Sequence, residues 1–131
     1  MYFYIKTADV LTDPSETGWM TIFIDTGAEG GFGNAYDIAV NRISPRDGKT
    51  TVEYFKDGEW KQLGYADIRY EGCEMMIAVD RHDIYSETAG GLWDLRFKVA
   101  DNYVDGDVMS FYTSGDSAPY GRYNFVFSEK K

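Results

Sequence analysis

Short runs of alternating hydrophobic and polar residues follow one another along the chain, and the stretch from 19 to 43 is the most informative of them. It contains two apolar segments around a glycine-rich loop, which is typical of a hairpin with a long loop. Because side chains alternate along a strand, positions 20, 22 and 24 share one face and positions 19, 21, 23 and 25 share the other. Both faces are largely apolar, so we expect a central and mostly buried strand.

Further strands are expected where β-branched and aromatic residues recur between turn signals. Asp-Gly pairs at 47–48 and 57–58, and Glu-Gly at 71–72, predict tight turns. The expected strands are residues 2–7, 50–55, 60–63, 66–70, 73–79, 93–99, 108–113 and 123–127, with a helical turn at 80–86 and a loop at 114–121. This spacing predicts an all-β fold, an antiparallel sandwich or barrel, and we favour the β-sandwich.

Two of these segments predict which side chains are buried. In each, apolar residues occupy alternate positions and should face the core: Trp93, Leu95, Phe97 and Val99 in one, and Cys73, Met75, Ile77 and Val79 in the other. The charged residues of the first segment should face solvent: Asp94, Arg96 and Lys98.

The length and the net charge of the chain limit which classes of function we expect. The 131 residues suit a single β-sandwich domain spanning 1–131. With 13 basic and 22 acidic residues the net charge is −9, which disfavours a nucleic-acid partner and docking on anionic membranes. No apolar run long enough to insert into a membrane occurs. Because a strand pattern is already under way at Met1, we expect the C-terminal part of a longer protein, whose open edge forms a homodimer or packs on the rest of its parent chain.

The candidate chemistry is sparse. One histidine, His82, and one cysteine, Cys73, cannot complete a tetrahedral zinc site, and no serine stands out as a partner for a catalytic triad. A pair of carboxylates for glycoside hydrolysis stays open as a less favoured alternative, because only their separation in space decides it. We therefore expect a protein that is not an enzyme.

An acidic loop after the segment 93–99 is a candidate calcium site. It gathers hard oxygen ligands, which calcium prefers, at Asp101, Asp105 and Asp107. The alternative is a turn in which Asp and Asn side chains bond to the backbone.

Aromatic residues among polar neighbours or near turns are candidates for sugar binding, since sugar rings stack on aromatic faces. The candidates are Trp60, Tyr103 and Tyr120, with Tyr112 in a similar position. The alternative is that these rings pack the core or cover strand edges.

The runs YFYIKTADVLTDP, WMTIFIDTG and YDIAVNRI, with LRFKVADN and FYTSGDSAPYGRYNF further on, resemble the family 9 carbohydrate-binding modules and their DOMON-like relatives. The resemblance implies a jelly-roll β-sandwich in a secreted protein, extracellular or at the cell surface. It also implies a sugar bound between two tryptophans, and structural calcium. The tryptophan positions fall near Ser15 and Ser114 here, so the resemblance implies the fold more strongly than the ligand. The rival function is an ancillary structural or interaction domain that binds no sugar of its own.

Overall fold

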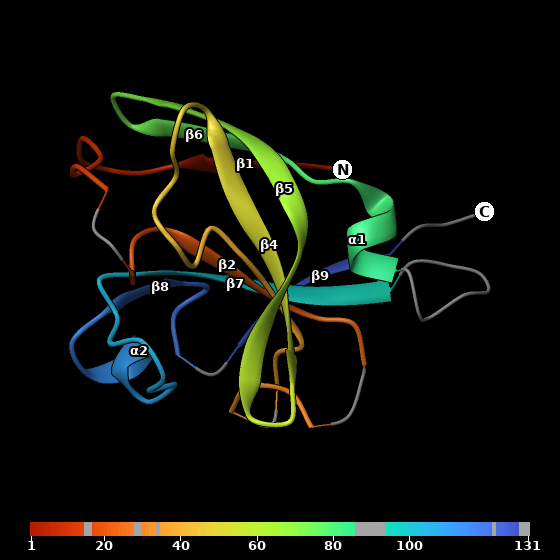
Figure 1. The fold of residues 1–131 in the computed structure, drawn as a ribbon. Helices are drawn as coiled ribbons and strands as arrows, with labels where there is room; N and C mark the ends of the chain where they lie inside the picture. The colour runs from red at the N-terminus through yellow and green to blue at the C-terminus, as the bar shows by residue number, and fades with distance from the viewer. Residues whose placement is uncertain (15–16, 28–29, 34, 86–93, 122, 129–131) are drawn as a thin grey trace.

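The computed structural model in Figure 1 describes residues 1–14, 17–27, 30–33, 35–85, 94–121 and 123–128. Its elements are β1 (Tyr2–Lys6), β2 (Thr21–Asp25), β3 (Ile38–Val40), β4 (Lys49–Lys56), β5 (Glu59–Glu71), β6 (Glu74–Ala78), α1 (Arg81–Tyr85), β7 (Asp94–Asp101), α2 (Ser110–Thr113), β8 (Asp116–Ala118) and β9 (Phe125–Ser128). The expected all-β fold is confirmed. None of the helices in the described residues has the length and apolar character needed to cross a membrane.

The nine strands of the described residues form one antiparallel sheet in the order β1-β6-β5-β4-β3-β2-β7-β8, with β9 also paired to β7. The sheet curls into a half-barrel, so that β1, β6 and β5 lie over β2, β7 and β8 in Figure 1. Phe3 of β1 and Phe97 of β7 meet across the curl, with ring centroids 5.3 Å apart. The two ends of the strand order therefore come close together in space.

The two faces of the sheet carry separate apolar clusters. The first, inside the curl, draws on β1 to β7 and includes Ile22, Ile24, Val52, Ile77 and Leu95. The second lies on the opposite face, and we call it the aromatic cluster; it consists of Phe23, Phe32, Tyr36, Ala39, Ala100, Tyr103 and Phe111. Strand β2 contributes to both, which confirms that it is central and buried on both faces.

The residues before β2 depart from the expected alternation. Trp19 and Met20 are consecutive, yet both pack in the first cluster. Met20 has a φ of 45°, in the left-handed region, which interrupts the extended backbone between the two side chains. The alternation therefore begins only at Thr21.

The β4–β5 hairpin turns at Asp57 and Gly58, whose φ values of 53° and 77° fit the type I′ turn expected from Asp-Gly. The separate strands expected at 60–63 and 66–70 are one strand, β5. Its register shifts, because Val52 pairs with Gly64 and Glu53 with Gln62, so Leu63 has no partner across the ladder. This bulge reverses the alternation along β5. Trp60 consequently packs against the aromatic cluster, whereas Ala66 and Ile68 face the first cluster.

The region after β7 was predicted least well. The strand expected at 108–113 is instead α2, because local polar groups favour a turn of helix: Asp107 Oδ1 accepts a hydrogen bond from Met109 N, and Ser110 Oγ donates one to Asp107 O. The loop expected at 114–121 contains the short strand β8. The helical turn expected at 80–86 is confirmed as α1.

The predictions of buried side chains hold in part. Met75, Ile77 and Val79 are buried as expected, but Cys73 lies half-buried in the β5–β6 turn. Leu95 and Val99 are buried and Phe97 is half-buried, while Trp93 lies outside the described residues.

Lys98 was expected to face solvent and is instead fully buried. Its Nζ donates hydrogen bonds of 2.7 Å to the carbonyl oxygens of Pro119 and Gly121, and it lies 5.8 Å from the centre of the Tyr112 ring. The loop after β8 therefore covers a face of β7 that the alternation assigned to solvent.

Candidate functional site

The first candidate site is a cleft beside Trp60, which we call the Trp60 cleft. The β4–β5 hairpin places Phe55 opposite Trp60, with ring centroids 5.0 Å apart. Phe32, from the loop between β2 and β3, packs against both rings, at 5.8 Å from Phe55 and 5.6 Å from Trp60. The cleft has a volume of about 340 Å³ and is lined by Phe32, Gly33, Phe55, Gly58, Trp60, Asp105, Gly106 and Val108.

Three charged residues form a network at the edge of this cleft. Arg42 donates two hydrogen bonds of 2.9 Å to the carboxylate of Glu53, from Nε and Nη2. Its Nη1 also donates to both oxygens of Asp105, at 3.1 and 3.0 Å. The guanidinium carbon lies 5.9 Å from the centre of the Trp60 ring, within the range of a cation–π contact. The network therefore holds a carboxylate and an aromatic ring in fixed positions next to each other.

The members of this network differ in their exposure to solvent. The side chains of Glu53 and Arg42 are only 5% and 13% exposed, whereas that of Asp105 is 38% exposed. Burial lowers the pKa of Arg42, but Glu53 and Asp105 together outweigh that effect and raise it above its usual value. Arg42 thus stays charged, and Asp105 is the member of the network that solvent and a ligand can reach.

Tyr103, a candidate for sugar binding, is buried and packs in the aromatic cluster beside the Trp60 cleft. Its ring centroid lies 5.4 Å from that of Phe23, which is also 6.1 Å from that of Trp60. The hydroxyl groups of Tyr103 and Thr21 are hydrogen-bonded at 2.7 Å, and burial raises the pKa of Tyr103. Tyr103 therefore supports the cleft from beneath and presents little of its ring to solvent.

Tyr120 lies apart from these residues. Its side chain is 88% exposed in the loop between β8 and β9, and it does not line the Trp60 cleft. Of the three expected sugar-binding residues, the fold thus brings Trp60 and Tyr103 together and leaves Tyr120 elsewhere. Of the two positions aligned with family tryptophans, Ser114 directly follows α2 and Ser15 lies outside the described residues.

The three expected calcium ligands each have another partner. Asp101 accepts a hydrogen bond of 3.1 Å from Met20 N, Asp105 binds Arg42, and Asp107 accepts one of 3.0 Å from Met109 N. Among the described residues, no group of three or more His, Cys, Asp or Glu side chains is placed to hold a metal ion. Calcium binding by these residues stays a prediction.

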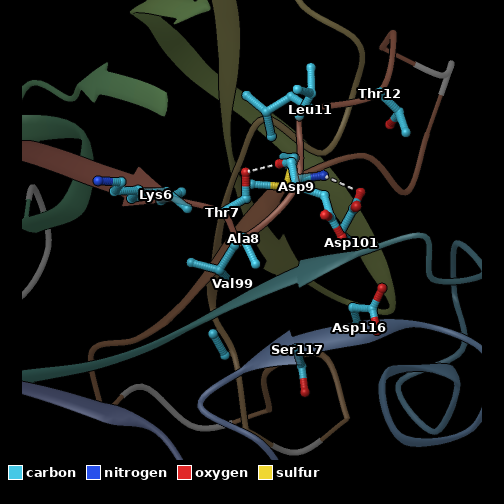
Figure 2. Close-up of a pocket in the computed structure, with 14 residues that line it drawn as sticks. Lys6, Thr7, Ala8, Asp9, Leu11, Thr12, Val99, Asp101, Asp116 and Ser117 are labelled. Carbon is cyan, nitrogen blue, oxygen red and sulfur yellow. Dashed lines mark hydrogen bonds between the residues drawn. The ribbon is translucent and has the colours of Figure 1, made fainter. Parts of the chain in front are cut away.

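The second candidate site is a groove of about 460 Å³ between the end of β1 and strands β7 and β8, which we call the β1–β8 groove. In Figure 2 the segment from Lys6 to Thr12 runs along one side, with Val99, Asp101, Asp116 and Ser117 along the other. Asp101 and Asp116 face each other in the β7–β8 ladder. The fold therefore brings an expected metal ligand next to a second aspartate, while Asp105 and Asp107 do not line this groove.

Comparison of the chain with protein-family models, with curated proteins and with solved structures gives no match. Function is therefore inferred from the two concave sites and from the sequence resemblance.

Sequence reasoning missed most of the residues that build the Trp60 cleft: Phe32, Arg42, Glu53 and Phe55. The position of Phe55 follows from the Asp57-Gly58 turn, since counting outward from a two-residue turn pairs Phe55 with Trp60. The Arg42–Asp105 contact joins residues 63 positions apart, and no local pattern signals it.

Proposed function

We propose that this chain is a non-catalytic carbohydrate-binding-like module that uses the Trp60 cleft. The single observation that carries the proposal is the exposed carboxylate of Asp105 in a cleft that three aromatic rings line. Small-molecule sites are mostly apolar and aromatic, with a few fixed polar groups, and typically span roughly 300–1,000 Å³. A cleft of about 340 Å³ accommodates one sugar ring or the end of a chain.

Each part of the cleft has a role in this proposal. The half-exposed Trp60 stacks against the C–H face of the sugar, and Phe32 and Phe55 keep that ring in place. Asp105 accepts hydrogen bonds from sugar hydroxyls, and Arg42 fixes its orientation. Because the polar and aromatic groups are held before a ligand arrives, little conformational entropy is lost on binding.

The proposal also includes the type of β fold that the sheet adopts. We infer that the curled sheet is a sandwich of the jelly-roll kind, in which the β1 end of the strand order forms one layer and the β7 end the other. The contact between Phe3 and Phe97 across the curl supports this arrangement. The resemblance to family 9 modules supports a secreted protein, extracellular or at the cell surface, with structural calcium.

A glycan-array screen followed by a fluorescence titration tests the function. Trp60→Ala should weaken binding of any array hit by about tenfold or more, which corresponds to roughly 1.4 kcal/mol. Tyr65→Ala is the matched control, because Tyr65 is an exposed aromatic of the same strand, β5, that does not line the cleft. Circular dichroism confirms that each variant folds. If no glycan binds, or if both variants bind equally well, the proposal fails.

One observation favours the rival, an ancillary interaction domain. Three consecutive apolar residues of β9 are exposed on both faces: Phe125 (44%), Val126 (62%) and Phe127 (42%). Contiguous exposed apolar surface of this kind marks contact sites. A dye that binds exposed apolar surface tests this function. If the dye no longer binds once the chain associates, and no glycan binds on the array, the interaction function is favoured over sugar binding.

A further inference from the structure

We propose that the β1–β8 groove binds an extended, basic segment of a partner protein, which adds as a strand to the free edge of β1. This function is separate from sugar binding in the Trp60 cleft and does not depend on it.

The free edge of β1 supplies the backbone groups. Within the described part of the chain, β1 is the terminal strand of the sheet and pairs with β6 alone. Two sets of hydrogen bonds show which residues point their backbone groups toward β6. Met1 and Val79 exchange two bonds, of 2.8 and 2.9 Å, and Thr7 N donates one of 2.8 Å to Cys73 O. Because this direction alternates in antiparallel pairs, Tyr2, Tyr4 and Lys6 point their N–H and C=O groups away from β6. Those groups are available to an added strand.

The groove extends along the whole of β1. A second cleft, of about 400 Å³, continues the β1–β8 groove toward the start of β1, and the two share Ile5, Lys6, Val99 and Ala118. Phe97 and Phe125 line the second cleft and lie 5.3 Å apart, centroid to centroid. An extended segment therefore meets backbone partners at the rim and apolar contacts below, which is the combination that strand addition uses.

Charge complementarity identifies the occupant as basic. The groove contains three carboxylates, Asp9, Asp101 and Asp116, against one ammonium group, Lys6. Asp101 and Asp116 lie directly opposite each other across the β7–β8 ladder, where like charges are unfavourable. A lysine or arginine side chain placed between them would relieve that repulsion. The net charge of −9 also favours the approach of a basic segment over that of a second copy of this acidic chain.

A fluorescence-polarisation titration with two labelled eight-residue peptides tests the proposal. One peptide alternates lysine with valine, and the other alternates glutamate with valine. The lysine peptide should bind at least about tenfold more tightly, and Asp101→Asn with Asp116→Asn should remove most of that difference. Asp57→Asn with Glu59→Gln is the matched control, since it removes two charges from the exposed β4–β5 turn. Equal binding of both peptides, or no binding of either, would overturn the proposal.

Hydrogen exchange separates strand addition from simple charge attraction. The lysine peptide should slow exchange of the Tyr2, Tyr4 and Lys6 amides by tenfold or more, and a version N-methylated at alternate residues should not. Unchanged exchange at these amides would overturn the proposal even if the peptide binds. Slowed exchange that depends on protein concentration without peptide would assign the edge to a second copy of the chain, and would also overturn it.

Discussion

Arg42 donates two parallel hydrogen bonds, each 2.9 Å long, to the carboxylate of Glu53. Asp105 is the third member of this charged network. This bidentate geometry is the strongest form of a charge-assisted pair. Because the Glu53 side chain is only 5% exposed, the carboxylate depends on Arg42 for its charge compensation. The pair should therefore stabilise the fold, and Arg42 also holds Asp105 at the Trp60 cleft.

The first prediction concerns this pair. Arg42→Met leaves Glu53 buried without a partner and should lower the free energy of unfolding by about 3–5 kcal/mol. The double variant Arg42→Met with Glu53→Leu should recover much of that loss, since an apolar pair of similar size needs no charge compensation. Urea denaturation measures both, with Arg46→Met as the exposed control. A double variant no more stable than Arg42→Met would contradict the prediction.

A second prediction compares the loss of stability caused by substituting each of two residues of β7. Both were expected to face the core fully, but Leu95 is 1% exposed and Phe97 is half-buried. Leu95→Ala should cost about 2–5 kcal/mol, while Phe97→Ala should cost less than the roughly 3–5 kcal/mol of a fully buried phenylalanine. Chemical denaturation of the two variants gives the comparison. A larger loss for Phe97→Ala would mean that its contacts with Phe3 and Phe125 dominate over its exposure.

The third prediction uses pH. Asp37 is buried, and this raises its pKa above the usual value despite the hydrogen bonds that it accepts from Thr26 N, at 2.7 Å, and from the Thr26 hydroxyl. Between the unfolded pKa of about 3.9 and the raised folded pKa, the folded state binds more protons than the unfolded state, so Asp37 contributes less stability as pH rises. The Asn side chain does not ionise. Asp37→Asn should therefore gain stability relative to the parent chain as pH rises from about 3 to 7.

Urea denaturation of the two proteins across this pH range measures the difference, in which the titrations that they share cancel. Asp57→Asn, at an exposed turn, controls for the loss of one charge. A stability difference between Asp37→Asn and the parent that stays constant with pH would argue against a raised pKa at Asp37.

The fourth prediction is calcium binding by the loop that carries Asp101, Asp105 and Asp107. A metal that binds only the native state raises the melting temperature as its concentration increases. The melting temperature should then be higher in excess calcium than in chelator. Asp107→Asn should reduce the difference, and Asp57→Asn should leave it unchanged. Equal melting temperatures in calcium and chelator would end the calcium hypothesis.

The sequence predicted those parts of the fold that local chemistry decides. The Asp57-Gly58 turn is one example, because few residues tolerate a positive φ at two successive positions. The burial of β2 on both faces is another, since Phe23 and Ile24 are apolar on opposite sides of one strand.

The predictions that failed depend on distant segments. Lys98 alternates correctly with its neighbours, and its burial is made favourable by distant partners, the carbonyl groups of Pro119 and Gly121 and the ring of Tyr112. Likewise, Trp60 and Tyr103 both contact Phe23, although no local pattern relates the segments that carry them. The sequence therefore predicted Trp60 as a candidate binding residue, but only the structure shows which other residues form the site around it.

The unpaired Leu63 has a consequence for how this chain tolerates changes in length. Deleting that single residue would make the β4–β5 ladder continuous and keep the pairs on either side of it, because Glu53–Gln62 and Val52–Gly64 would become successive pairs. Trp60 would stay opposite Phe55, since the two-residue turn at Asp57 and Gly58 fixes that pair. Substitutions at Leu63 should matter little for the same reason. Position 63 is therefore a place in β5 at which the chain should tolerate the loss of one residue with the aromatic cleft still on the outer surface of the protein.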